Sequence, residues 1–374
     1  MKHQPFRLYR VIGLFLLSLL LMMEQVDATI RRVCNLPIGI APYSSAQAAV
    51  NDAANGDTIL IYGTAKEYDA IMIADKRVVL IGPGISPQGS NKLTAKLSSL
   101  TIQNSLANGA PDYSEFHGLE LTSGFFVMGS VITQHLLFNS CYVKSNCLMN
   151  PGTNWTYIGY RFTNNYFSNA TISFSSTPAN TTSVDSFIFF NNVVRLISGN
   201  FFKQFYQGWE RIIQHNLFYA PSFQVPIFES GTCRFFMLKD NIFSQNSDFE
   251  NGDQVTYFNN LTFNCDNNSP WLLTGHVDSG GNLSNISPLL GSQAQVISTL
   301  QNPALNFEPQ SGSPALGVSS DGKNIGVLFE SFPDPNYRRG LNGVLSYIVQ
   351  TQPLGEANPG GTIPLRIQAN HIKR

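Results

Sequence analysis

One short phrase recurs through the middle of the chain: an apolar or aromatic run, one or two asparagines, then a second apolar pair. The last asparagine of each phrase follows the previous one at intervals of 26, 27, 24, 25 and 19 residues. These residues are Asn139, Asn165, Asn192, Asn216, Asn241 and Asn260. A repeat of about 20 to 30 residues is typical of a solenoid, in which each repeat forms one coil.

The residue types of the repeat favour β-strands over helices. The apolar runs are short and rich in Phe, Tyr, Ile and Val. Asparagine tolerates the left-handed backbone conformation, so it can turn the chain sharply between two strands. If the turn recurs once per coil, the side-chain amides stack and can bond along the axis. The alternative is an antiparallel β-sandwich, which favours Asn-Gly turns about 8 to 12 residues apart. No Asn-Gly separates the paired runs.

The beginning of the repeat region predicts a capped solenoid. Residues 44–54 are alanine-rich after a serine, which predicts a helix, and strand-like runs follow at 58–63 and 78–84. Together with the asparagine repeat, this arrangement resembles the right-handed parallel β-helix of the pectin-lyase-like superfamily, of the secreted bacterial type. The resemblance implies an all-β fold in which the helix covers the open end of the first coil. We expect the β-helix to span 29–330.

After Phe263 the pattern weakens. We expect 275–292, which is rich in Gly, Ser and Asn, to leave the regular coil. The pieces Ser313-Pro314-Ala315 and Ile325-Gly326 resemble the closing coil of bacterial proteins of the superfamily. Residues 331–374 are predicted to form a tail packed on the solenoid.

The first 28 residues predict a secretory signal peptide. Lys2, Arg7 and Arg10 precede an apolar block at 11–23, and Val26-x-Ala28 favours cleavage after Ala28. The alternative, a membrane anchor, needs about 20 apolar residues. We therefore expect a protein secreted or held at the cell surface, with no membrane span in the mature chain.

Charge and cysteine content narrow the possible partners. A formal net charge of −1 gives no electrostatic case for nucleic acid, and we expect a monomer. The five cysteines contain no paired CxxC, which argues against zinc, and Cys141 with Cys147 is a candidate small disulfide loop.

The resemblance also implies chemistry, because enzymes of the superfamily cleave acidic polysaccharides as lyases or as aspartate-based hydrolases. The motifs of the polygalacturonase, pectate lyase and alginate or chondroitin lyase types do not occur in this sequence. No catalytic residue is assigned, and two hypotheses stay open. One is a polysaccharide-interacting protein, with a lyase of unidentified site included; the other is a non-catalytic structural or adhesive protein.

A binding face is predicted in the segment 195–211. The resemblance places the ligand face on the sheet before the loops that precede the asparagine-bearing strands. Aromatic rings cover the apolar side of a sugar, and cations pair with its acid groups. The predicted binding residues are Arg195, Lys203, Tyr206, Trp209 and Arg211. The alternative is that the aromatic residues of this segment, Trp209 among them, fill the interior and its cations are solvated.

No metal site or cofactor is predicted, with calcium as the only candidate. Asp248, Glu250 and Asp253 have a loose calcium-like spacing without the full binding loop. Each histidine is isolated in the sequence, and His215 stands where other phrases carry asparagine. We interpret His215 as a structural turn residue.

Overall fold

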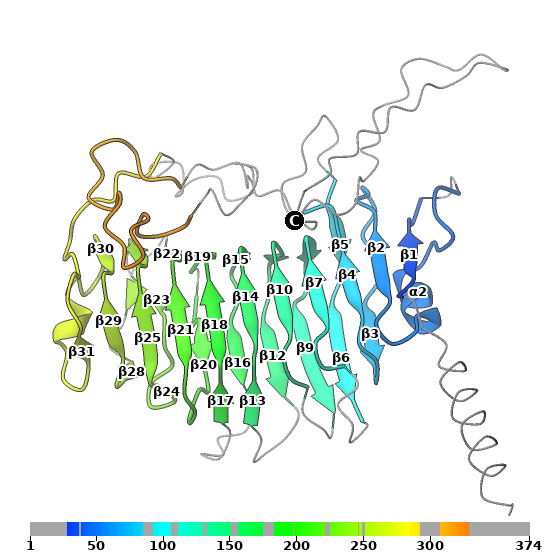
Figure 1. Cartoon of the computed structure of the whole chain (residues 1–374), viewed down its shortest axis with the longest axis horizontal. Coiled ribbons are helices and arrows are strands. Elements are labelled where there is room, and N and C mark those ends of the chain that lie inside the picture. Colours follow the sequence, from blue (N-terminus) through cyan, green and yellow to red (C-terminus); the bar gives the residue numbers. More distant parts are fainter. Residues whose placement is uncertain are drawn as a thin grey trace, which may run out of the picture.

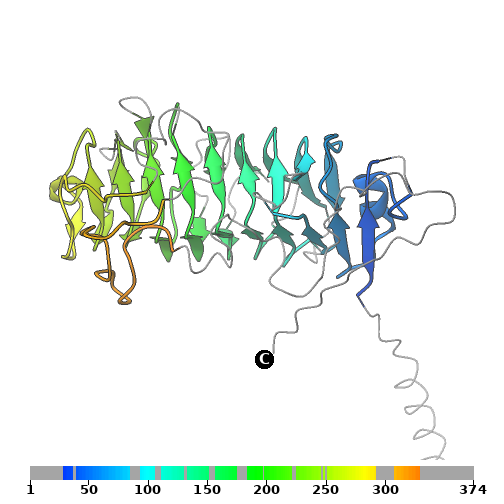
Figure 2. The ribbon, with the colours of Figure 1, turned by 90° about the horizontal axis from the view of Figure 1, so that it is seen from above.

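The strands of the protein wind into one elongated solenoid (Figures 1 and 2). The computed structural model describes residues 28–36, 39–84, 93–105, 111–129, 133–150, 156–174, 183–196, 198–220, 225–245, 247–248, 251–291 and 307–328. Three long sheets of parallel strands run through the described residues. The predicted all-β parallel β-helix is thus confirmed, whereas residues 1–27 of the predicted signal peptide and the predicted tail at 331–374 lie outside the described residues.

Each long sheet collects one strand from successive coils, and neighbouring strands within a sheet are parallel. Sheet A consists of β1 (Ile30–Val33), β2 (Thr58–Ile61), β4 (Val79–Ile81), β7 (Glu115–His117), β10 (Leu137–Asn139), β14 (Arg161–Thr163), β18 (Phe187–Phe190), β21 (Arg211–Gln214), β25 (Phe236–Lys239), β29 (Thr256–Phe258) and β31 (Val277–Asp278). Sheet B consists of β5 (Ala95–Leu97), β8 (Leu119–Leu121), β11 (Tyr142–Val143), β15 (Tyr166–Ser168), β19 (Val193–Arg195), β22 (Leu217–Tyr219), β26 (Ile242–Ser244) and β30 (Leu261–Phe263).

Sheet C and three short pairs complete the coils, together with one 3-10 turn, η1 (Pro270–Leu272). Sheet C consists of β3 (Ile71–Ala74), β6 (Leu100–Asn104), β9 (Phe125–Gly129), β12 (Cys147–Asn150), β16 (Ile172–Phe174) and β20 (Phe202–Lys203). The short pairs are β13 (Thr156–Ile158) with β17 (Ser183–Asp185), β23 (Val225–Pro226) with β27 (Ser247–Asp248), and β24 (Cys233–Arg234) with β28 (Gly252–Asp253).

The interior is built from inward-facing side chains that stack coil on coil. Phe138 pairs in register with Phe162, and Phe162 with Phe189, so equivalent rings lie above one another. The Phe138 and Phe162 rings are 4.9 Å apart and nearly parallel. Because strand residues alternate between the two faces of a sheet, one apolar set fills the core.

A helix closes the N-terminal end, as predicted, although it is shorter than 44–54. Helix α2 (Ala46–Asp52) begins where the Ser45 side chain accepts a hydrogen bond from the amide of Ala48. Its buried residues, which include Ala49 and Val50, belong to the same core as the first coils. At its other end the Lys76 ammonium donates to main-chain carbonyls, including that of Ala53 at 2.9 Å.

The C-terminal segment 307–328 runs back along the outside of the solenoid (orange in Figure 1), so the prediction of a closing coil there is wrong. Val318 contacts Asn259, Ser320 contacts Asp240, and further along Leu328 donates to Asn191 at 2.6 Å. The outer face of sheet B is apolar, and this segment covers it. The sheet B side chains in this contact are Tyr166, Val193, Leu217, Tyr219, Ile242 and Leu261. They pack against Leu290, Phe307, Ala315, Ile325 and Val327.

The regular coil also continues beyond residue 275, where we expect the chain to leave it. Strand β31 pairs with β29, and the amide oxygen of Asn282 accepts hydrogen bonds from Asn260, so part of 275–292 remains in the coil. No helix of the described residues is long and apolar enough to cross a membrane.

All five cysteines are free and buried, so the candidate disulfide between Cys141 and Cys147 is not formed. Burial raises the pKa of Cys141 to about 12 and that of Cys233 to about 11. The thiols therefore act as small core residues, in which the reactive thiolate is disfavoured.

Candidate functional site

The two ends of the sheet A strands are the most regular turns in the solenoid. We call the turn from a sheet A strand into sheet B the exit corner, and the turn that leads into a sheet A strand the entry corner. Both corners repeat a residue with positive φ in successive coils. The side chains at these residues differ between the two corners in polarity and in exposure to solvent.

The exit corner carries the predicted asparagine ladder. From Asn165 onward, the asparagine of each coil donates from its main-chain and side-chain nitrogens to the side-chain oxygen of the next. Asn139 is not part of the ladder, because it lies in β10 and the amide of Cys141 donates to Asn165 in its place. For Asn192 these bonds to Asn216 Oδ1 are 2.7 and 3.1 Å long. The same pattern continues through Asn241, Asn260 and Asn282. The amides therefore form one continuous column down the long axis.

Next to the ladder stands a second column, formed by the positive-φ residue that follows each sheet A strand. Its members from β14 to β29 are Asn164, Asn191, His215, Asp240 and Asn259, with φ between 52° and 58°. His215 thus occupies a structural turn, as the sequence predicts. The C-terminal segment covers this column, and Asn191, His215 and Asp240 are fully buried.

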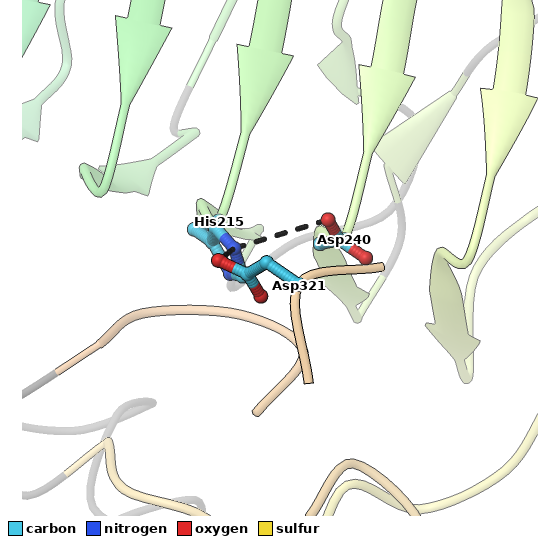
Figure 3. A group of neighbouring side chains, drawn as sticks. All are labelled: His215, Asp240 and Asp321. Carbon is cyan, nitrogen blue, oxygen red and sulfur yellow. Dashed lines mark ion pairs between the residues drawn. The ribbon is translucent and has the colours of Figure 1, made fainter. Parts of the chain in front are cut away.

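Two members of the covered column meet a carboxylate from the C-terminal segment (Figure 3). His215 Nε2 lies 3.3 Å from Asp321 Oδ2 and 3.8 Å from Asp240 Oδ2. The three ligand-type atoms lie within 4.8 Å of one another. We call these three residues the His–Asp cluster.

The carboxylates of the His–Asp cluster are held by neighbouring groups. Asp240 accepts hydrogen bonds from the amide and hydroxyl of Ser320 and from Gln214 Nε2 at 3.1 Å. Burial alone would raise the pKa of Asp321, but the hydrogen bond from Ser319 and the charges of His215 and Lys323 outweigh it and lower the pKa to about 2. Asp321 is therefore ionised at neutral pH.

The imidazole of His215 has no hydrogen-bond partner of suitable geometry on either ring nitrogen, although its side chain is 0% exposed. Its ring packs edge-on against Phe190 at 5.6 Å. A buried polar group without a hydrogen bond costs about 1–3 kcal/mol. The Nε2 atom faces the carboxylates of Asp240 and Asp321, so a bonding partner for this nitrogen would lie between the three side chains.

The entry corner is open to solvent and carries aromatic residues. Its positive-φ residues include Tyr113, His135 and Phe235. The rings of Tyr113 and His135 stack 4.5 Å apart at 11°. Further along the axis, Trp209 stacks on Phe235 at 5.8 Å and is 72% exposed. We call Tyr113, His135, Trp209 and Phe235 the aromatic ledge.

Several charged groups around the aromatic ledge are held by neighbouring groups. Arg234 forms an ion pair with Asp253 at 3.1 Å, and Glu210 accepts a hydrogen bond from Ser186. Arg77 donates to the carbonyl oxygen of Tyr113 at 3.1 Å. The exposed feature of the ledge is therefore ring surface.

The five predicted binding residues do not lie on one surface. Arg195 belongs to sheet B, Lys203 to sheet C and Arg211 to sheet A. Tyr206 and Trp209 lie in the segment that connects Lys203 in β20 to Arg211 in β21. Of the five, only Trp209 is part of the aromatic ledge. The alternative prediction, that aromatic residues of this segment fill the interior, is correct for Phe201, Phe202 and Phe205 and wrong for Trp209.

Arg211 is an interior residue. It is 1% exposed, and its guanidinium donates to the carbonyl oxygens of Val184, Phe205, Gln207 and Arg234. It also lies 5.5 Å from the Phe205 ring centroid. The buried charge is thus used on main-chain acceptors within the coil, and a ligand on the surface cannot reach it.

The candidate calcium run is split by the fold. Asp253 lies in β28 and its carboxylate pairs with Arg234, whereas Asp248 lies in β27. Glu250 lies outside the described residues.

No protein-family model and no curated protein sequence matches this chain.

Sequence reasoning missed the His–Asp cluster and most of the aromatic ledge. The sequence does contain a signal for the ledge. The residue immediately before the sheet A strand is the polar Glu210 in one coil, and the equivalent residue in the next coil is the aromatic Phe235. Asp321 gives no such signal, since its position follows from how a segment far along the chain folds back.

Proposed function

We propose that this chain is a secreted polysaccharide-binding protein of the pectin-lyase-like kind, which holds its ligand along the aromatic ledge. The observation that carries the proposal is the exposed ring of Trp209, stacked on Phe235 and 72% exposed. An exposed aromatic ring pair of fixed orientation presents the kind of surface that packs on the apolar face of a sugar.

The spacing of the ledge suits a chain-like ligand. Three strand steps separate His135 from Trp209, through Gly159 and Ser186. At about 4.8 Å per strand this is about 14 Å along the axis. The intervening residues have short side chains, so a polymer lying parallel to the long axis could contact both ring pairs.

Ring stacking should dominate over charge in this mode of binding. Arg234 is paired with Asp253 beside the ledge, so this cation is less available to a uronate. We expect affinity to change less than about threefold between low and high salt, because screening acts mainly on exposed charges. A uronate held by unpaired cations would instead be released by salt.

The test is binding of the full chain to a panel of neutral and uronate polysaccharides, measured by calorimetry, with absorbance of unsaturated products followed in parallel. Replacing Trp209→Ala or Phe235→Ala should weaken binding at least about tenfold, as hot-spot aromatic residues do. The matched control is Leu272→Ala, an exposed apolar residue at the C-terminal end that lies outside the ledge. Unchanged binding by both ledge variants, or no binding to any glycan, would refute the proposal.

A specific observation favours the second candidate, a non-catalytic adhesive protein. Ile188, Ile212 and Met237 stand in register on the outer face of sheet A, and Met237 is 45% exposed. Such an apolar row suits docking of another protein. Changing Ile212→Ser should abolish that docking and leave glycan binding intact, which separates the two functions.

A further inference from the structure

We propose that the His–Asp cluster binds a divalent transition-metal cation of the Zn²⁺ class, and that the bound cation fastens the C-terminal segment to the solenoid. His215 and Asp240 come from two successive coils, and Asp321 comes from the segment that runs back over them. A cation held by all three would therefore join parts of the chain that are distant in sequence.

The distances fit a small cation. Zn²⁺ bonds to histidine nitrogen and carboxylate oxygen at about 2.0–2.1 Å, so tetrahedral ligand atoms lie about 3.3–3.4 Å apart. Nε2 of His215 lies 3.3 Å from Asp321 Oδ2 and 3.8 Å from Asp240 Oδ2. Both separations are within about 0.5 Å of that edge length.

The state of His215 points to a ligand. The imidazole is fully buried and neither ring nitrogen has a hydrogen bond, yet Nε2 is directed between two carboxylates (Figure 3). An unprotonated Nε2 would face two anionic oxygens, and a cation between the three atoms would attract all of them. One nitrogen with two oxygens suits Zn²⁺, since Ca²⁺ and Mg²⁺ prefer all-oxygen sites.

The surrounding residues act as the outer shell of such a site. Ser320 holds Asp240 through its amide, and Ser319 donates to Asp321 Oδ1. These bonds fix the carboxylates so that an oxygen of each faces His215. The hydroxyl of Ser320 and Gln214 Nε2 both donate to Asp240 Oδ2, and the bond from Gln214, the longer of the two at 3.1 Å, is the one that a cation would replace. Replacing Gln214→Ala should accordingly leave Zn²⁺ affinity unchanged or raise it.

The competing explanation is a protonated His215 paired with the two aspartates and no metal. Lys323, whose ammonium lies 3.6 Å from Asp321 Oδ2, would then be a further cation of the same network. The two explanations differ in one respect. The ion-pair network needs no added cation, whereas the metal site stabilises the fold in proportion to the logarithm of free Zn²⁺.

The experiment uses the purified full chain, stripped with EDTA and titrated with Zn²⁺, with Ca²⁺ as the comparison cation. We expect about one bound Zn²⁺ per chain by elemental analysis, a melting temperature that rises with Zn²⁺ concentration, and no such rise with Ca²⁺. Trypsin cleavage after Lys323, a half-exposed residue of the C-terminal segment, should slow at least about tenfold when Zn²⁺ is bound, because the fastened segment opens less often.

The variants are His215→Asn and Asp321→Asn. Asparagine occupies the same positive-φ turn in other coils, at Asn191 and Asn259, so His215→Asn should fold. Both variants should lose Zn²⁺ binding more than about tenfold and lose the Zn²⁺-dependent part of the stability. His117→Asn is the control, because His117 forms a similar pair with Glu115 outside the cluster.

Absence of Zn²⁺ from the wild-type chain with no change of melting temperature would overturn the proposal. So would equal Zn²⁺ binding by His215→Asn and the wild type, which would place the cation elsewhere. A loss of stability in His215→Asn that is the same with and without Zn²⁺ would assign the cluster to the ion-pair network.

Discussion

The exit and entry corners of sheet A use the same backbone conformation for opposite purposes. At the exit corner the positive-φ column from Asn164 to Asn259 is polar, and much of it is buried under the C-terminal segment. At the entry corner the equivalent column carries Tyr113 and Phe235, which are exposed. A left-handed residue costs a non-glycine side chain about 1–2 kcal/mol at either corner.

The difference between the corners is what happens to the side chain beyond the turn. Asn191 is buried, and its amide repays the cost with hydrogen bonds to Asn164 and to the main chain of Leu328. Phe235 gains only ring contact with Trp209. Burial thus demands a hydrogen-bonding side chain at the exit corner, whereas solvent leaves the entry corner free to vary and to bind ligands.

The largest effect should come from the asparagine ladder itself. Replacing Asn216→Ala removes the acceptor of the Asn192 amide and the side-chain donor to the Phe189 carbonyl, all in buried surroundings. We expect the free energy of unfolding to fall by about 2–5 kcal/mol, because buried donors and acceptors are left unpaired. Urea unfolding followed by circular dichroism measures this change.

The matched control for the ladder is Asn146→Ala, an exposed asparagine outside the corner columns. Its free energy of unfolding should change by less than about 0.5 kcal/mol. If Asn146→Ala and Asn216→Ala were equally mild, the exit corner would not depend on its amides.

A smaller loss is expected from Asn191→Gly in the covered column. Glycine keeps the backbone conformation at no steric cost, but the bonds to Asn164 and Leu328 are lost. We expect a loss of about 1–2 kcal/mol in the free energy of unfolding. A faster proteolytic release of the C-terminal segment should accompany it.

The same change at the entry corner should have the opposite sign. Gln254 is exposed and has a φ of 52°. Gln254→Gly removes the left-handed strain and should raise the free energy of unfolding by up to about 1 kcal/mol. If both glycine variants shifted the urea midpoint in the same direction, the contrast between the corners would fail.

The smallest effect on stability is expected at the aromatic ledge. Because Trp209 is 72% exposed, Trp209→Ala should change the free energy of unfolding by less than about 0.5 kcal/mol. Its effect should appear in glycan affinity. A large loss of stability in this variant would give the ring a structural role.

Much of the fold follows from the repeat. Identical asparagines at one point of each coil have to stack if the chain winds evenly, so the column from Asn165 to Asn260 was predictable from spacing. The helix at 44–54 was predictable from its alanine content, although its bounds were not. Arg211, predicted as a binding residue, is buried, because the sequence does not distinguish an arginine whose side chain enters the core from one that faces solvent.

The sequence by itself determined the local geometry of this protein: short strands, a sharp turn at the asparagine of the repeat and an apolar interior, all of which depend on contacts between adjacent repeats. Only the tertiary structure decided which turns are covered and which are open. Ser320 meets Asp240 across 80 residues of chain, and no periodicity encodes that contact. Burial by a distant segment is a property of the folded chain, and it brings Asp321 to His215 while leaving Trp209 in solvent.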